Sequence, residues 1–555
     1  MRTKKCLATA VVFLAALCLV PPGVRAQQPS VSAISQAVAK ISARESEEMN
    51  AIRQYSPLVE TYIQKVKVNS DEVWAPDGDH YFIGRAEFAN GFGVRSIEPR
   101  DAGAFDRLAA NVSRVLQFGP QFLPQGFLQM IYADEHGLDG ANYKFEYVRQ
   151  EFLGEVRTLV FDVTPAKKSK GRFVGRIWAE DRNFTIVRFN GAYSGGDERY
   201  RGFHFDSWRV NAGSNLWLPA FIYSEENVVK SPKRAPSFKA QTRLWGYNAG
   251  RAGQEEELSR VLVESATPVK DEARQEHDLS PIQEARAWEG QAAGNIVDKL
   301  QRIGLIAPRG EVDKVLDTVV NNLEVTNNIE LDPEVDCRVL MTSTLESFAV
   351  GHTIVLSRGL IDVLPDEASL AAILAEELSR LMLGPQVNTQ YAFYDRLMNF
   401  DEAQTFSHFD FAHTAAEDRA ASAKALELLR NSPYKDQLAA AGMFMAELQR
   451  RAQKIPNLIS PRLGNAVLAS QVVAADSEAK PARNQIVALP LGSRVKVDPW
   501  SDDLAMLKAA PAGSVSEREE LSFEVTPFML YLTRQESGAA KVTSTRKPGK
   551  DTNSR

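Results

Sequence analysis

Cysteine and histidine are scarce in this chain, with three cysteines and seven histidines among 555 residues. Cys6 and Cys18 lie in the first twenty residues, and Cys337 stands alone in the apolar run 337–341. One remaining cysteine excludes an internal disulfide once the first residues are removed. We therefore expect Cys337 to be a buried structural thiol rather than a nucleophile.

Basic charge and long apolar runs are also in short supply. The formal net charge of -6 excludes the basic footprint of a nucleic-acid-binding protein. Beyond the first residues, no segment is apolar enough to span a membrane. The hydrophobic share of 44% and the charged share of 25% are ordinary for a soluble globular protein, and the length suits two or three domains.

The first 26 residues have the three parts of a secretory signal peptide. A positive start at 1–5 precedes an apolar stretch at 7–20, and Val24-Arg25-Ala26 follows a Pro-Pro-Gly break. The apolar stretch is shorter than the roughly 20 residues that span a bilayer. We expect cleavage after Ala26 and a periplasmic or secreted mature protein without a transmembrane segment. Leu17 before Cys18 argues against lipid modification.

The first half of the mature chain is predicted to be a β domain. Residues 27–57 form a helical lead-in, and period-two segments divided by turns fill 58–250. One helical stretch, Phe105–Met130, interrupts them. The clearest predicted strands are Tyr143–Phe152, Val156–Val163, Gly171–Glu180, Phe184–Gly191, Tyr200–Val210 and Leu216–Tyr223.

The second half is predicted to be mainly helical over 280–455. A small β-rich appendage is expected at 485–535, with strands at Ser493–Asp498 and Ser522–Leu532, and a disordered tail at 536–555. The fold class is therefore α+β. The predicted helices are Ile282–Ile306, Val312–Leu323, Ala368–Leu383, Ala415–Leu429 and Lys435–Ala452, and the short strands are Arg338–Thr342 and Thr353–Ser357.

The helix at 368–383 contains a degenerate zinc motif. In HExxH enzymes two histidines at i and i+4 hold zinc on one helix face, and the intervening glutamate polarises the metal-bound water. The same frame reads Glu376-Glu377-Leu378-Ser379-Arg380 here. Glu377 keeps the position of the general base, while Glu376 and Arg380 replace both imidazoles.

The surrounding residues carry a family resemblance. The run Glu346-Ser347-Phe348-Ala349-Val350-Gly351, the segment 353–361 with Gly359-Leu360, and the acidic pair before the helix resemble HtpX- and BepA-like gluzincin metallopeptidases. The resemblance covers roughly residues 280–450. It implies an edge strand, a second strand and a descent into the metal helix.

The resemblance also implies a third ligand, a glutamate followed four residues later by an aspartate. Aligning on the leucine-rich end of the next helix places Asp418 at the ligand position and Ser422 at the aspartate position. A shift of one residue uses Glu417 but finds Ala421. In either alignment the supporting aspartate is lost.

Charge explains how the helix tolerates the loss of zinc. Glu376 and Arg380 stand at i and i+4 in the favourable order for an ion pair, so a guanidinium replaces the metal cation. The alternative is that both side chains face solvent. A rebuilt metal site would have to use carboxylates with His408 or His413, whose spacing of five does not suit one helix face, and His352 replaces no ligand. We expect no metal or other cofactor, and zinc only if the enzyme is active.

The β domain has a second resemblance. The segments 161–168, 175–180 and 217–220 resemble LolA-like lipoprotein-carrier half-barrels, which curl an antiparallel sheet around an apolar cavity closed by a helix. Five aromatics are candidates to line such a cavity, with plain sheet core as the more ordinary interpretation. The basic tip 167–170 is interpreted as a solvated turn. The five are Trp178, Phe189, Phe205, Trp208 and Trp217.

Three functions remain open on the sequence. The first is a non-catalytic envelope protein in which a peptidase-like domain serves as a scaffold for lipoprotein, lipid or protein clients. The second is an active metalloendopeptidase with Glu377 as base and a metal held by Glu376, Asp418 and a histidine. The third is a lipid or lipoprotein carrier whose C-terminal half is structural. The first is the interpretation we adopt.

Overall fold

The structure is a computed structural model of the whole chain. It describes residues 31–68, 74–88, 91–97, 127–167, 169, 171–194, 203–213, 215–226, 238–247, 281–383, 415–459, 495–497, 504–506, 523, 525–527 and 529–534. The predicted signal peptide at 1–26 and the tail at 536–555 lie outside these residues. No helix among the described residues is long and apolar enough to cross a membrane.

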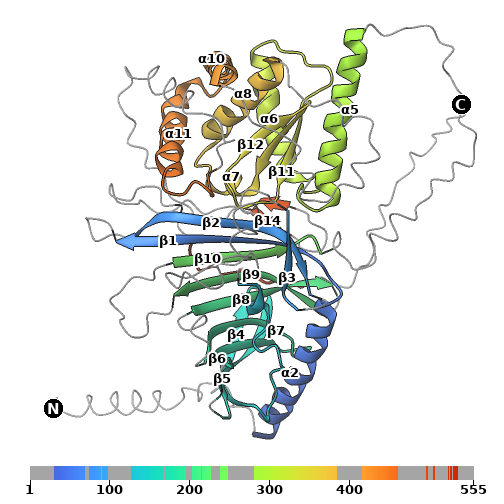
Figure 1. Cartoon of the computed structure of the whole chain (residues 1–555), viewed down its shortest axis with the longest axis vertical. Helices are drawn as coiled ribbons and strands as arrows, with labels where there is room; N and C mark the ends of the chain where they lie inside the picture. The colour runs from blue at the N-terminus through green and yellow to red at the C-terminus, as the bar shows by residue number, and fades with distance from the viewer. Residues whose placement is uncertain are drawn as a thin grey trace, which may run out of the picture.

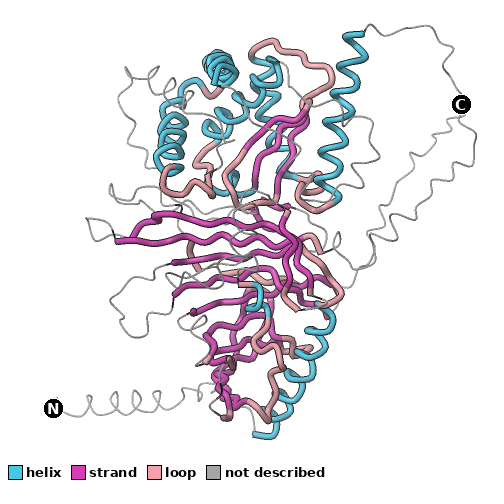
Figure 2. The backbone as a smooth tube through the Cα atoms, in the orientation of Figure 1, coloured by secondary structure: helices cyan, strands magenta, loops and turns pink. Residues whose placement is uncertain are grey.

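A ten-stranded antiparallel sheet forms the N-terminal half (Figures 1 and 2). Its order is β3-β2-β1-β10-β9-β8-β7-β6-β5-β4. Strands that follow each other in the chain are neighbours in the sheet, except that β3 and β4 lie at opposite edges and β1 pairs with β10. The sheet is open, with edges at β3 and β4. The strands are β1 (Leu58–Val68), β2 (Trp74–Glu87), β3 (Gly93–Ser96), β4 (Tyr143–Leu153), β5 (Val156–Pro165), β6 (Phe173–Glu180), β7 (Ile186–Tyr193), β8 (Phe203–Gly213), β9 (Leu216–Glu226) and β10 (Phe238–Trp245).

The six strands predicted between 143 and 223 are confirmed as β4 to β9. Their alternation of apolar and polar residues is typical of a sheet with two different faces. The predicted helix Phe105–Met130 falls mostly outside the described residues. Within the described part, only the short 3-10 helix η2 (Leu128–Ile131) is present.

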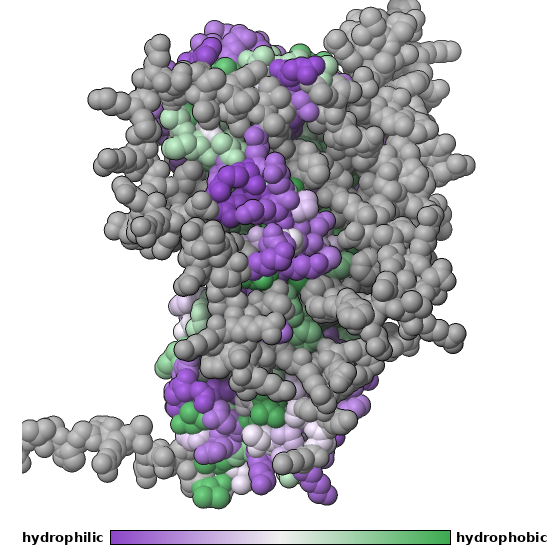
Figure 3. Space-filling model, turned by 60° about the vertical axis from the view of Figure 1, so that its left-hand side comes forward, coloured by the Kyte–Doolittle hydropathy of each residue, from purple (hydrophilic) through white to green (hydrophobic). Residues whose placement is uncertain are grey.

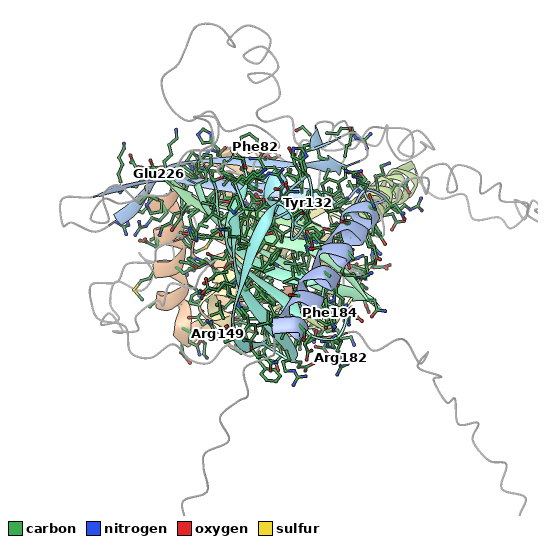
Figure 4. The ribbon with its side chains drawn as sticks, turned by 90° about the horizontal axis from the view of Figure 1, so that it is seen from below. Phe82, Tyr132, Arg149, Arg182, Phe184 and Glu226 are labelled. Atoms are coloured by element: carbon green, nitrogen blue, oxygen red, sulfur yellow. The ribbon has the colours of Figure 1, made fainter. Side chains whose placement is uncertain are left out.

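The helix α2 (Val31–Ile52) and η2 pack on one face of the sheet. Their buried apolar residues share a core with Phe82, Phe189 and Phe205. Figure 4 shows Phe184 beside α2, where the Lys40 ammonium lies 4.7 Å from the centroid of its ring. The predicted helical lead-in therefore packs on the sheet and covers this face.

The candidate cavity aromatics do not share a face. Phe189 and Phe205 belong to the core under α2, whereas Trp178, Trp208 and Trp217 belong to the core on the opposite face. All five are at most 6% exposed. Arg188 stacks on Trp178 and Trp208 at 4.3 and 4.4 Å from their ring centroids. These aromatics pack as the core of the two faces, and one cavity cannot be lined by all five.

A fully buried ion pair ties α2 to the sheet. Arg209 on β8 donates to both oxygens of Glu45 at 2.7 and 2.6 Å and also to the carbonyl of Ile131 at 3.2 Å. Glu48, one turn after Glu45, is also buried, and its Oε2 has no hydrogen-bond partner. Burial raises the pKa of Glu48 to about 7, although Arg209 and Arg44 lower it.

This pKa predicts a pH-dependent stability. A glutamate whose pKa is raised in the folded state contributes stability that is fully present below its unfolded pKa of about 4.3 and is lost as the pH rises through 7. We expect Glu48→Gln to flatten the fall in the free energy of unfolding between pH 5.5 and 8.5. Urea denaturation at several pH values measures this. Glu47→Gln, at an exposed position on the same helix, is the control and should leave the slope unchanged.

The C-terminal half holds helices around a small sheet of three strands (Figure 1). In this sheet β13 lies between β11, to which it is parallel, and the edge strand β12, to which it is antiparallel. The predicted helices and short strands are confirmed, with Lys435–Ala452 divided into η6 and α11. The elements are α5 (Pro281–Arg302), α6 (Glu311–Thr326), β11 (Asp336–Leu340), β12 (Ser347–Val350), β13 (Thr353–Ser357), α7 (Arg358–Val363), α8 (Glu367–Leu383), α10 (Ala415–Arg430), η6 (Lys435–Gln437) and α11 (Leu438–Ala452).

The two halves share one hydrophobic core. The face of the sheet opposite α2 contributes Leu58, Tyr62 and Trp245 to this core. The C-terminal half contributes buried residues of α5, α6, α7, α8, α10 and α11. Polar groups cross the same junction. Trp245 donates its ring N–H to the carbonyl of Gly304 at 2.9 Å, and Arg85 donates to the carbonyl of Ile303 at 2.8 Å.

The predicted β appendage is confirmed in one part and wrong in another. β14 (Val495–Val497) and β15 (Leu504–Met506) form a two-stranded ladder, as expected near Ser493–Asp498. The described residues between Phe523 and Arg534 form no strand, contrary to the expectation for Ser522–Leu532. Their backbone bonds to the Gln64 side chain and to the β4–β5 turn instead of to a neighbouring strand.

Figure 3 shows hydrophilic residues gathered around mid-height on one face of the described surface, with separate hydrophobic patches above and below them. Cys337 is fully buried, as expected, and burial raises the pKa of its thiol above the usual range.

Candidate functional site: a carboxylate cluster around Arg380

The helix α8 positions the residues of the degenerate motif. Its start is capped by Asp366, whose Oδ1 accepts a hydrogen bond of 2.8 Å from the backbone N–H of Ser369. The helix contacts α6, α10, α11 and the strand β12, so nearly all of its surface is covered. Glu376, Glu377 and Arg380 are all less than 9% exposed.

The guanidinium of Arg380 lies among three carboxylates. It donates to Glu376 at 2.7 Å, to Glu377 at 2.7 Å and to Asp418 on α10 at 3.4 Å. The ion pair expected from the i, i+4 spacing is therefore present, and the solvent-facing alternative is wrong. The same guanidinium also binds Glu377 and Asp418. The spacing within one helix did not predict these two contacts.

The hydroxyl of Ser347 completes the environment of Glu377. Ser347 lies on the edge strand β12 and donates a hydrogen bond of 2.7 Å to Oε1 of Glu377, the oxygen that also accepts from Arg380. In an active enzyme the carboxylate at this position polarises a metal-bound water. Here Oε1 of the carboxylate accepts from Ser347 and Arg380, and its other oxygen, Oε2, is buried without a hydrogen-bond partner among the described residues.

Of the two acidic residues considered for a third ligand, Asp418 lies within ion-pair distance of Arg380. Asp418 points to Arg380, whereas Glu417, which the one-residue shift would use, is exposed. Ser422, at the position of the supporting aspartate, is fully buried, and its hydroxyl has no hydrogen-bond partner.

Charge is balanced unevenly in the cluster. Burial raises the pKa of Glu376 to about 8 against the opposing effect of Arg380, and the neighbouring Glu377 and Asp418 raise it further. Burial disfavours the charge on Arg380, but Glu377 and Glu376 raise its pKa above the usual range, so it stays charged. A proton on Glu376 brings the charge of the carboxylates closer to that of the single guanidinium.

The geometry does not fit zinc. The positions implied by the family resemblance supply two carboxylates and a guanidinium, and the guanidinium stands within hydrogen-bond distance of the acidic groups that a metal would need. Among the described residues no group of three or more histidine, cysteine or acidic side chains is arranged to hold a metal ion. His408 and His413 lie outside the described residues, and His352 lies in the turn between β12 and β13.

Gly359, at the start of α7, has no room for a larger side chain. A Cβ at this position would lie 2.1 Å from the carbonyl oxygen of Ser343, far inside van der Waals contact. The Gly359 N–H also donates to the carbonyl of Thr342 at 3.0 Å. This close approach holds the segment 342–347 against α7 and thereby places Ser347 opposite Glu377.

Ser347 is the site residue that sequence reasoning missed. It lies in β12, before α8, but a serine in a four-residue strand has no distinctive sequence pattern. Its position on β12 could have indicated the contact. Side chains of a strand alternate between two faces, and one face of β12 packs against α8.

The fold and the site thus define an α+β chain with an open ten-stranded antiparallel sheet and a buried, internally paired charge cluster. No family model and no curated protein matches the chain. Solved structures similar to it include a LolA superfamily protein from Nitrosomonas europaea, at 14% identity over 37% of this chain and 90% of that chain, with a TM-score of 0.19.

Two further structures complete the comparison. A putative outer membrane lipoprotein-sorting protein domain from Vibrio parahaemolyticus is 10% identical over 37% of this chain and 91% of its own, with a TM-score of 0.18. A DUF1329 family protein from Desulfovibrio piger is 12% identical over 40% and 98%, with a TM-score of 0.21. TM-scores this low carry no functional argument. The metallopeptidase resemblance stays a prediction from sequence.

Proposed function

We propose that this chain is an exported, non-catalytic binding protein of the cell envelope, in which a metallopeptidase-like half has lost zinc chemistry and serves as a scaffold. The observation that carries the proposal is the Arg380 guanidinium among Glu376, Glu377 and Asp418. A fixed internal cation neutralises the acidic groups without an open coordination position. The export rests on the predicted signal peptide, and the clients are lipoproteins, lipids or proteins.

The proposal predicts the metal content of the purified protein. We expect no stoichiometric zinc by elemental analysis and no chelator-sensitive proteolysis, because the guanidinium excludes a second cation by charge. Glu377→Gln is expected to leave any residual peptide hydrolysis unchanged, as is the exposed control Glu427→Gln. One zinc per chain, together with activity lost only in Glu377→Gln, would establish an active metalloendopeptidase and overturn the proposal.

The lipid-carrier alternative has its own test. The aromatic residues proposed for a lipid cavity are divided between the two faces of the sheet and buried in separate cores. Organic extracts of the purified protein, analysed by mass spectrometry, separate a lipid client from a protein client. A stoichiometric lipid would favour the carrier over the scaffold role.

A further inference from the structure

An extended segment near the C-terminus lies against the sheet on the face opposite α2. We call it the strap and define it by its described residues 523, 525–527 and 529–534. The side chains of Phe523, Val525 and Leu532 are at most 2% exposed and belong to the core that the two halves share. Met529 and Tyr531 are 71% and 66% exposed on the same segment. The strap is therefore anchored at its two ends and exposed between them.

One anchor is a side-chain amide that mimics a backbone. Oε1 of Gln64 accepts a hydrogen bond of 2.8 Å from the N–H of Val525, and its Nε2 donates to the carbonyl of Phe523. The amide is held in place from behind. Nε2 also donates to the Tyr62 hydroxyl at 3.1 Å, which donates to Asp79 at 3.1 Å. The Tyr62 hydroxyl, itself bonded to Asp79, thus holds the Gln64 amide in the orientation that meets the strap.

The other anchor lies at the β4–β5 turn. The N–H of Glu155 donates to the carbonyl of Leu532 at 2.8 Å. Gly154 has a φ of +66°, and a Cβ there would lie 2.5 Å from the Leu532 oxygen, so the turn leaves room for a passing chain. Arg534 then donates to the buried carboxylate of Glu180. The strap is thus held by three hydrogen bonds to its backbone, by three buried apolar side chains and by the ion pairs of Arg534 with Glu180 and Asp181.

These contacts are those of a bound peptide rather than of a strand in a ladder. Main-chain hydrogen bonds supply affinity independent of sequence, and pockets for spaced side chains supply specificity. We propose that the strap is a tethered ligand of a groove built for an extended peptide. At the Gln64 end the groove binds two apolar residues with one residue between them, as in Phe523 and Val525. At the β4–β5 turn it binds the pattern Leu-x-Arg, as in Leu532 and Arg534. A free peptide with the sequence of the strap binds the same groove once the tether is cut. This proposal does not depend on the absence of zinc chemistry.

The test uses the full chain with a protease site inserted between Ala512 and Gly513. After cleavage, a labelled synthetic peptide of residues 521–535 is added, and its binding is followed by fluorescence anisotropy. We expect saturable binding, competition by the unlabelled peptide, and competition weakened about tenfold or more in a peptide with Leu532→Asp and Arg534→Glu, as the loss of a buried contact predicts. Gln64→Ala in the protein should weaken binding about tenfold, whereas Gln150→Ala on the exposed edge of β4 should not.

Two results would overturn the proposal. One is a cleaved protein that keeps its fold by circular dichroism but takes up no labelled peptide at about 100 μM, a concentration that detects even weak peptide affinity. The other is loss of the fold on cleavage, which would make the strap part of the obligatory core. The altered peptides are tested on unaltered protein, so a folding defect in Gln64→Ala does not obscure the outcome.

Discussion

Replacement of Arg380 by methionine is expected to lower the free energy of unfolding by about 3–5 kcal/mol, the cost of removing one partner of a buried ion pair. The guanidinium is the shared partner of Glu376, Glu377 and Asp418, and it lies in a helix covered by its neighbours. Without it, the buried carboxyl groups of Glu376 and Glu377 lose their counter-ion. Chemical denaturation monitored by circular dichroism measures the loss.

Matched variants separate charge from packing. The triple variant Arg380→Met, Glu376→Gln, Glu377→Gln removes the uncompensated charges, so it should recover most of the lost stability. Lys424→Met removes an exposed cation whose ion pair with Glu427 lies at the surface, and it should cost no more than about 0.5 kcal/mol. If Arg380→Met costs as little as Lys424→Met, the cluster is hydrated and the guanidinium does not replace a metal cation.

The second large effect is expected at the junction of the two halves. Glu60 on β1 is 1% exposed and accepts hydrogen bonds from the Tyr81 hydroxyl at 2.8 Å and from Arg243 at 2.9 Å. It also accepts from the N–H and the hydroxyl of Ser343 in the C-terminal half, at 2.6 and 2.7 Å. Arg358 is nearby, and burial together with Arg243 lowers its pKa to about 10. Glu60 is thus the counter-ion of buried Arg243 at the junction of the two halves.

We expect Glu60→Gln to destabilise the protein by about 3–5 kcal/mol, because buried Arg243 loses its counter-ion. An amide also brings N–H groups toward donors and cannot satisfy all four. The two halves should then unfold less cooperatively, so that tryptophan fluorescence and far-ultraviolet circular dichroism give separate midpoints. Glu47→Gln, at a side chain 65% exposed, is the control. Coincident midpoints with unchanged stability in Glu60→Gln would show that the junction does not couple the halves.

Local patterns in the sequence determined the secondary structure and the loss of the histidines. Period-two alternation located β4 to β9, and the apolar spacing located α8, because these patterns depend on residues close together in the chain. The Glu376–Arg380 pair followed from the i, i+4 geometry of any helix. The strand predicted at 522–532 failed for a related reason. Its composition favours a strand, but its backbone partner is the side chain of Gln64.

Tertiary structure decided what each face meets. On β1 the residues Leu58, Glu60, Tyr62 and Gln64 share one face, and polar members of such a row normally face water. Here the C-terminal half and the strap cover that face, so Glu60 and Gln64 become buried anchors.

The cluster around Arg380 shows the same division. The sequence by itself determined that Arg380 stands one helix turn from Glu376. Only the packing of α8 against β12 and α10 brought Ser347 and Asp418, 30 and 38 residues away from their partners, to the same charges. The physical reason is that a buried charge must be satisfied by whatever groups surround it in space, and those neighbours come from separate elements that only the fold brings together.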